Sequence, residues 1–288
     1  MWWIVGIAGL SLASWGIVST RAALYPDRRT PPIPHPAASF TTARLVARDG
    51  VPFEVWRFQT PSPRARVLIC HGYYAYRYQV VDIAQGLRTR GYEIVLFELR
   101  GHGERPGPCT FGLKEAEDAT TLLQWAKQLD HGVLLPVGVL GLSLGAAVVC
   151  HVASRESSVQ AVVVDSIYSR LFPILQRALW QRYHLPTFPF AWVTWWGLQL
   201  ALRRRLRSID PVVLAPQLHQ PLFAIQGGED RRVVPMLARE FYQRWAGSKE
   251  RWFEPRVAHV GMFTHNPQEY CDRVARFFDG VFKGMSAA

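Results

Sequence analysis

The sequence predicts an α/β protein in which a mostly parallel sheet is covered by helices on both faces. From about residue 52 onward, short apolar segments alternate with longer helical ones, and this order of elements is typical of parallel sheets. With 288 residues, 49% of them hydrophobic, the chain can bury one substantial core. No repeat or low-complexity tract indicates a second one.

The expected elements follow one another along the chain. Apolar runs predict strands near residue 52 and at 66–70, 92–98, 133–140, 160–165, 222–226 and 251–258. Helices are predicted at about 78–90, 113–129, directly after residue 145, and at 235–246 and 267–283. Residues 166–209 interrupt the alternation after the fifth strand of the core, and we expect an irregular helical insertion there.

The most informative motif is Gly-Leu-Ser-Leu-Gly around Ser143. An apolar run at 133–140 enters the motif as a strand, and small apolar residues at 146–153 leave it as a helix. A serine hydroxyl is a weak nucleophile, so a sharp turn must hold it clear of the backbone beside a base. Gly141 and Gly145 suit such a turn, because side chains there would collide with the neighbouring strand and helix. The motif predicts an activated Ser143.

Such a nucleophile requires an acid and then a histidine further along the chain. Asp230 follows the strand at 222–226, and His259 follows the last predicted strand. Open α/β sheets place their functional sites at the carboxyl ends of strands. We therefore predict Asp230 as the acid and His259 as the base.

Other residues compete for these roles. Glu229 neighbours Asp230, and Asp165 ends the strand at 160–165, so either carboxylate is an alternative acid. His265 is a weaker alternative base, because it lies on the approach to the last helix.

An oxyanion hole is expected beside these groups. The strand at 66–70 runs into His71-Gly72, and the bend there leaves backbone N–H groups free. We predict that the amides of Tyr73 and Leu144 bind the developing oxyanion. His71 itself is interpreted as a residue that orders the loop.

These motifs resemble those of the α/β-hydrolase superfamily, in particular its monoacylglycerol-lipase-like and serine-aminopeptidase-like serine hydrolases. The matching pieces are His71-Gly72, Glu-Leu-Arg-Gly-His-Gly at 98–103, Gly-Leu-Ser-Leu-Gly at 141–145, Gly-Glu-Asp-Arg-Arg-Val-Val-Pro at 228–235, and Ala258-His259. The resemblance covers residues 45–283 and implies an α/β-hydrolase fold with a helical lid at about 166–209. It also implies that Ser143 is the nucleophile, Asp230 the acid and His259 the base. Glu98 departs from the family, where Asp is commoner.

The first 24 residues predict a hydrophobic anchor helix. No charged residue lies between Trp2 and Thr20, and the run is just long enough to span a bilayer. Arg21, Arg28 and Arg29 follow it, so the positive-inside rule predicts a cytoplasmic catalytic domain. A cleaved signal, giving a secreted or periplasmic enzyme, and a buried N-terminal helix are the alternatives. Residues 25–44 are expected to be a stiff proline-rich linker.

The formal net charge of +11 indicates an anionic partner. We expect no nucleic acid, because no zinc spacing, helix-turn-helix pattern or aromatic–basic RNA-binding signature is present. Anionic lipid headgroups fit the charge better beside a membrane anchor. The predicted lid is rich in aromatic residues and ends in the basic run 203–207. It either packs on the core with a solvated basic end or contacts the membrane interface.

The cysteines are widely scattered, at Cys70, Cys109, Cys150 and Cys271. None has the spacing of a metal site, so we expect reduced structural thiols, no metal and no cofactor. The sequence thus predicts a membrane-anchored serine hydrolase that cleaves acyl esters, with lipid-like esters such as monoacylglycerols or lysophospholipids as the favoured class. A peptidase or amidase of the same fold, and a non-catalytic protein that only binds a ligand, are the alternatives.

Overall fold

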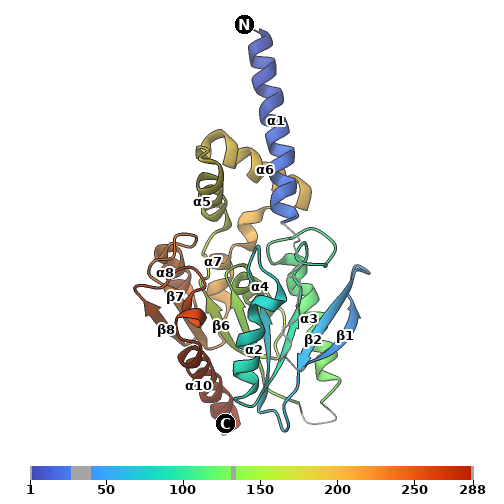
Figure 1. Cartoon of the computed structure of the whole chain (residues 1–288), viewed down its shortest axis with the longest axis vertical. Helices are drawn as coiled ribbons and strands as arrows, with labels where there is room; N and C mark the ends of the chain where they lie inside the picture. Colours follow the sequence, from blue (N-terminus) through green and yellow to red (C-terminus); the bar gives the residue numbers. More distant parts are fainter. Residues whose placement is uncertain (1, 27–39, 131–133, 287–288) are drawn as a thin grey trace.

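The structure is a computed structural model that describes residues 2–26, 40–130 and 134–286. One eight-stranded sheet runs through the body, in the order β1-β2-β4-β3-β5-β6-β7-β8 (Figure 1). The strands are β1 (Thr41–Val46), β2 (Pro52–Phe58), β3 (Ala65–Cys70), β4 (Tyr92–Phe97), β5 (Val137–Leu142), β6 (Val159–Asp165), β7 (Leu222–Gly227) and β8 (Lys249–Glu254). From β4 to β8 all neighbours are parallel, whereas β2 pairs antiparallel with both β1 and β4. This arrangement confirms the predicted fold class.

Helices cover both faces of the sheet, which divides the core into two layers. One layer lies under α3 (Leu113–Lys127), α4 (Leu144–Ala153) and α8 (Pro235–Arg244). The other lies under α2 (Val81–Arg88) and α10 (Pro267–Ser286). The central strands β3, β4, β5 and β7 are buried along their whole length, so their continuous apolar runs were readable in the sequence.

Two elements at the sheet edges differ from the predictions. Most of the predicted linker, 27–39, lies outside the described residues, but its last residues, 41–44, belong to β1. This strand is largely exposed and mixes polar and apolar residues, so it contains no apolar run long enough to predict it. At the other edge, β8 ends at Glu254, before Pro255, and the four residues that follow form a loop instead of the predicted strand end.

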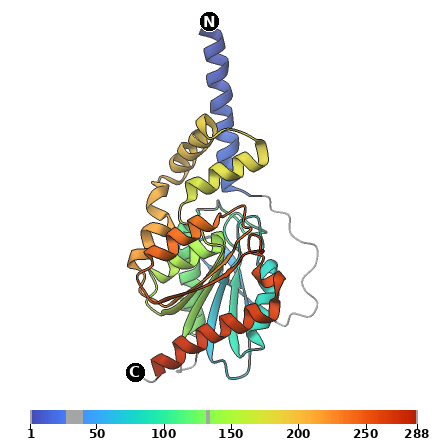
Figure 2. The same ribbon diagram turned by 90° about the vertical axis from the view of Figure 1, so that its left-hand side faces the viewer.

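Between β6 and β7 the chain makes the predicted helical insertion. Its longer helices are α5 (Leu171–Tyr183) and α6 (Trp192–Leu202), which lie beyond the carboxyl ends of the parallel strands in both views (Figures 1 and 2). The shorter helices of the chain are η1 (Arg77–Val80), η2 (Thr187–Ala191), η3 (Leu206–Ile209), α7 (Pro211–Leu214), η4 (Ala215–Gln217) and α9 (Met262–His265).

The N-terminal segment forms α1 (Trp2–Leu24), which extends away from the sheet while its second half packs against α6 (Figures 1 and 2). Gly16 approaches Val193, and the buried hydroxyls of Ser19 and Thr194 lie 2.7 Å apart. Across residues 2–26, 40–130 and 134–286, no helix is long and apolar enough to cross a membrane. The predicted membrane anchor, and the membrane localisation inferred from it, are therefore wrong. In the second half of α1, the small residues Gly16 and Ser19 lie against α6.

Candidate active site

Ser143 lies at the turn between β5 and α4, as the Gly-x-Ser-x-Gly motif predicts. Its backbone is strained, with φ at 54° and ψ at −111°, and its N–H donates to the carbonyl of Asp165 at 2.8 Å. A Cβ on Gly141 would collide with the backbone of Gly145, and one on Gly145 would collide with the carbonyl of Cys70. Both glycines are therefore needed for the close approach of β5, α4 and β3 that forces Ser143 outward.

His259 and Asp230 reach Ser143 from two loops at the carboxyl ends of β8 and β7. The Nε2 of His259 lies 3.0 Å from the Oγ of Ser143, and its Nδ1 lies 2.7 Å from Oδ2 of Asp230. The Asp230 side chain is fully buried, whereas 14% of the His259 side chain is exposed. This line of contacts can move a proton from the serine to an imidazole that a buried carboxylate orients.

The Asp230 carboxylate is fixed by its own loop. Its Oδ1 accepts hydrogen bonds from the backbone N–H groups of Arg232 at 2.9 Å and Val233 at 2.8 Å. The Gln226 amide of β7 donates to Oδ2 at 3.3 Å. The backbone bonds could have been expected from the turn after Gly227-Gly228, but the role of Gln226 depends on which way its side chain turns.

The side chains of the three residues predicted as alternatives are not part of the line of contacts from Ser143 to Asp230. Glu229 is exposed, whereas its neighbour Asp230 is buried. Asp165 is buried at the end of β6, where its carboxylate accepts a hydrogen bond from the hydroxyl of Ser166. His265 is exposed at the end of α9. The structure thus brings the side chains of Ser143, His259 and Asp230 together. None of the three alternative side chains joins these hydrogen bonds, although the backbone carbonyl of Asp165 accepts from the N–H of Ser143.

The loop after β3 lies directly beside the nucleophile. A Cβ on Gly72 would be 3.4 Å from the Cβ of Ser143, so glycine lets this backbone approach closely. Tyr73 follows Gly72 along the chain, and Leu144 follows Ser143 and begins α4. The binding of an oxyanion by their amides stays a prediction.

His71 orders this loop instead of facing the reacting atoms. It is fully buried, its Nδ1 lies 2.8 Å from the carbonyl of Gly72, and its Nε2 accepts from the N–H of Leu99 at 3.1 Å. The Glu98 carboxylate lies 2.7 Å from the same Nε2. The loops after β3 and β4 are therefore tied together through one imidazole.

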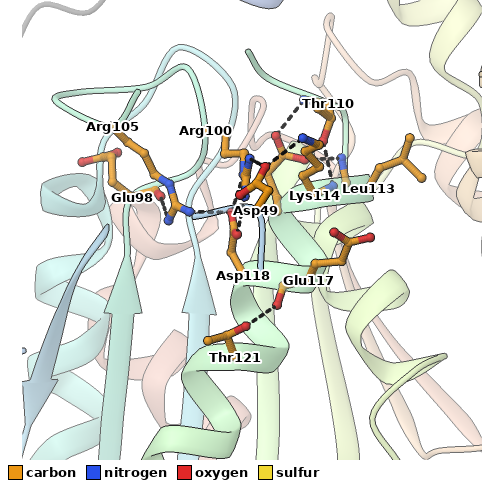
Figure 3. A network of polar contacts seen from close by, with 12 residues as sticks. Asp49, Glu98, Arg100, Arg105, Thr110, Leu113, Lys114, Glu117, Asp118 and Thr121 are labelled. Atoms are coloured by element: carbon orange, nitrogen blue, oxygen red, sulfur yellow. Dashed lines mark hydrogen bonds and ion pairs between the residues drawn. The ribbon is translucent and has the colours of Figure 1, made fainter. Parts of the chain in front are cut away.

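The Arg-Gly-His-Gly motif after β4 belongs to a buried polar network (Figure 3). Arg100 donates to both Asp118 oxygens at 2.7 Å, and to the two oxygens of Asp49 at 2.7 and 2.9 Å. Arg105 also donates to Asp118, at 2.5 Å, and to the carbonyl of Glu98 at 3.1 Å. Hydrogen bonding to Arg100 holds the pKa of Asp49 below its usual range, and burial lowers the pKa of Arg105 to about 10. The network fixes the loop that supports His71.

An aromatic cluster lies between α5 and α6 of the insertion. The Phe172 ring of α5 lies 4.9 Å from the Trp192 ring and 5.1 Å from the Trp195 ring, both of α6. Phe172 also packs against the buried core that contains Leu144. The insertion and the helix that follows Ser143 therefore share one apolar core.

Within the part of the chain that the structure describes, no group of three or more His, Cys, Asp or Glu residues could hold a metal ion. All four cysteines are buried and free.

Comparisons with known proteins agree with this architecture. The family model described as "Serine aminopeptidase, S33" matches residues 61–195. An uncharacterized protein of Bacillus subtilis, YqkD, is 22% identical over 219 residues, which cover 75% of this chain and 71% of that protein. A putative monoglyceride lipase of Schizosaccharomyces pombe is 24% identical, over 76% of this chain and 68% of that protein.

A solved structure extends the likeness to nearly the whole chain. An esterase of Pyrococcus furiosus superposes with a TM-score of 0.75 at 23% identity, covering 90% of this chain and 100% of that one. Sheet order, nucleophile turn, family model and structural likeness agree, and the chain belongs to the α/β-hydrolase superfamily.

Proposed function

We propose that the protein is a serine hydrolase that cleaves carboxylic esters through an acyl-enzyme. The observation that carries the proposal is the line of contacts from Ser143 Oγ through His259 to Asp230, with 3.0 Å and 2.7 Å between its polar atoms. The Oγ attacks the ester carbonyl while Nε2 of His259 takes its proton. Asp230 keeps the imidazole in the orientation and tautomer that present Nε2 to the serine.

The same groups complete the turnover. The amides of Tyr73 and Leu144 stabilise the negative charge on the carbonyl oxygen, an effect usually worth a few kcal/mol of barrier. His259 then gives its proton to the departing alcohol, which leaves the acyl group on Ser143. Water attacks this acyl-enzyme with His259 as the base, and the acid departs.

Ester cleavage is favoured over amide cleavage by the relatives. A putative monoglyceride lipase and an esterase are among them, although the matching family model is described as a serine aminopeptidase. The same tetrahedral chemistry serves both reactions, so the leaving group must be tested directly. We expect kcat/KM for a p-nitrophenyl ester to exceed that for the matching p-nitroanilide by orders of magnitude. A higher value for the anilide would indicate a peptidase or amidase.

For the substrate we propose a lipid-like acyl ester, such as a monoacylglycerol or a lysophospholipid. We propose that the acyl chain lies along the aromatic cluster of Phe172, Trp192 and Trp195, whose rings pack together in the insertion. Each buried methylene contributes about 0.8 kcal/mol, so kcat/KM should rise by up to roughly fourfold per carbon. The measurement is kcat/KM for p-nitrophenyl esters from acetate to palmitate, and a maximum at acetate or butyrate would contradict the lipid-like class.

The decisive test of the enzyme itself is labelling by a fluorophosphonate probe, which reacts with activated serines. We expect the wild-type protein to be labelled and Ser143→Ala to be inert. Ser154→Ala, which removes a hydroxyl at the other end of α4, is the matched control and should be labelled normally. Labelling that persists in Ser143→Ala would refute the nucleophile. An inert wild-type protein without esterase activity would favour the non-catalytic alternative.

A further inference from the structure

The backbone directly after His259 is held in a costly conformation. Val260 has φ at 54°, in the left-handed region that a β-branched residue rarely enters. The side chain that precedes it must nevertheless meet both Ser143 and Asp230 within hydrogen-bond distance. Such strain persists only where neighbouring groups hold it in place.

One side-chain group that holds Val260 is the hydroxyl of Ser166. The N–H of Val260 donates to Ser166 Oγ at 3.0 Å, and the two residues are far apart in the sequence. Ser166 itself donates its hydroxyl proton to Oδ1 of Asp165 at 2.9 Å. Because a hydroxyl has one proton, this donation leaves a lone pair free to accept from Val260. The Asp165 carboxylate therefore sets the direction in which Ser166 acts.

The pair Asp165–Ser166 is itself rigidly placed. Both residues are fully buried at the end of β6. The N–H of Ser166 donates to the carbonyl of Ile225 in β7 at 2.9 Å, and the carbonyl of Asp165 accepts from the N–H of Ser143 at 2.8 Å. This two-residue segment thus contacts both the backbone of the nucleophile and the loop of the base.

The chemistry of Asp165 suits this use. Burial raises its pKa to about 6, while the hydroxyl of Ser166 and the positive charge of a protonated His259 act in the opposite direction. Above that pH the group is a carboxylate, which only accepts hydrogen bonds, and the hydroxyl proton of Ser166 must then point toward it.

We propose that Ser166, oriented by Asp165, is a positioning residue that stabilises the strained Val260 backbone and thereby aims His259 at Ser143. The inference rests on the proposed function, because it assigns Ser166 a part in placing the general base. It gives the carboxylate at the end of β6 a purpose separate from that of Asp230. Neither residue touches the reacting atoms.

The test is a pair of substitutions and their combination. Ser166→Ala should lower kcat for an ester by about tenfold to a hundredfold and change KM little, because a small misplacement of the base affects the chemical step. Val260→Gly removes the strain, since glycine adopts positive φ freely. In the Val260→Gly background, the loss of the Ser166 hydroxyl should therefore cost a markedly smaller factor in kcat.

Matched controls separate this role from a general loss of stability. Ser169→Ala removes another buried hydroxyl three residues along the same loop and should leave kcat unchanged. If Ser166→Ala does not fold, Ser166→Gly replaces it, because Ser166 also has a positive φ, of 58°. Melting temperatures are measured for every variant. The inference would be overturned if Ser166→Ala lowered kcat by the same factor in the Val260→Gly background as in the wild type. Full activity of Ser166→Ala would also overturn it.

The failure of this inference is distinguishable from failure of the proposed function. If the wild type hydrolyses esters, Ser143→Ala is inert and Ser166→Ala is fully active, only the positioning role is lost. If fluorophosphonate labelling persists in Ser143→Ala, the nucleophile itself is wrong.

Discussion

The loops at the carboxyl ends of the strands depend on local sequence patterns, whereas the helical cover formed by α1, α5 and α6 depends on contacts between distant segments. In the strand-end loops, Ser143 and Asp230 each follow an apolar strand and a glycine, and His259 follows the last strand after a short loop. In the cover, α1 meets α6 and the neighbouring η2 through residues that have no local signature. Gly197 lies against Thr20, and the Trp15 indole donates to the carbonyl of Phe190 at 3.3 Å. Local patterns predict local geometry, whereas helix–helix contacts depend on the whole fold.

The largest effect is expected in the strand-end loops, where we propose that the reaction takes place. Asp230→Asn should lower kcat by roughly 10⁴-fold, because an amide stabilises the wrong tautomer of His259. Asp165→Asn should cost far less, since its amide oxygen can still accept from Ser166. The measurement is kcat for an ester, with the exposed Glu229→Gln as the control. If the ranking of Asp230 and Asp165 were reversed, the acid would lie on β6.

A second effect should appear where α4, behind the nucleophile, meets the insertion. His151 of α4 donates through Nε2 to the carbonyl of Ile209 at 3.0 Å, and burial lowers its pKa from 6.5 to about 4. The unfolded chain therefore binds a proton at higher pH than the folded one. The contribution of neutral His151 to the free energy of unfolding is complete above pH 6.5. It is lost as the pH falls toward 4, by about 3 kcal/mol in all.

This pH dependence is measured as a difference between proteins. Burial raises the pKa values of Asp165 and Asp210 to about 6, and their contributions have the opposite sign in the same range. They are common to the wild type and to His151→Gln, so they cancel in the difference of unfolding free energies. The unfolding free energy of the wild type minus that of the variant should decrease as the pH falls from 6.5 to 4. A constant difference would show that His151 does not titrate in this way.

The contrast also explains what the sequence could and could not predict. The sheet core, the insertion and the site residues Ser143, Asp230 and His259 were predictable, because buried parallel strands and the turns at their ends leave strong local signals. The exposed edge strand β1 has no apolar run and was missed. For α1, apolar composition alone predicted a membrane span, but the buried Ser19 and Thr20 show that its second half faces α6. The hydroxyl of Ser166 became informative only beside Val260, which is remote in sequence.

The contact between α1 and α6 offers a test of the helical cover. Gly197→Ala should lower the free energy of unfolding by about 1–3 kcal/mol, because its Cβ would overlap the Thr20 side chain. Gly9→Ala, on the exposed part of α1, is the matched control, since nothing lies within 4 Å of its Cβ. The control should be neutral or stabilising by up to about 1 kcal/mol. Equal stabilities of the two variants in urea unfolding would show that α1 does not pack on α6.

The smallest expected effect connects the two regions. The hydroxyl of Tyr73, in the loop after β3, donates to the carbonyl of Ala23 near the end of α1 at 2.8 Å. The N–H of Cys109 donates to the carbonyl of Leu24 at 2.7 Å. Tyr73→Phe keeps the ring and removes the first bond, so it should cost about 1 kcal/mol of stability and lower kcat/KM several-fold. The loss should fall on kcat if α1 helps to hold the amide of Tyr73 in place. Tyr74→Phe, at the exposed neighbouring position, is the control and should be close to wild type. If Tyr73→Phe lost stability but kept kcat, α1 would support the fold of this loop without affecting the chemistry beside it.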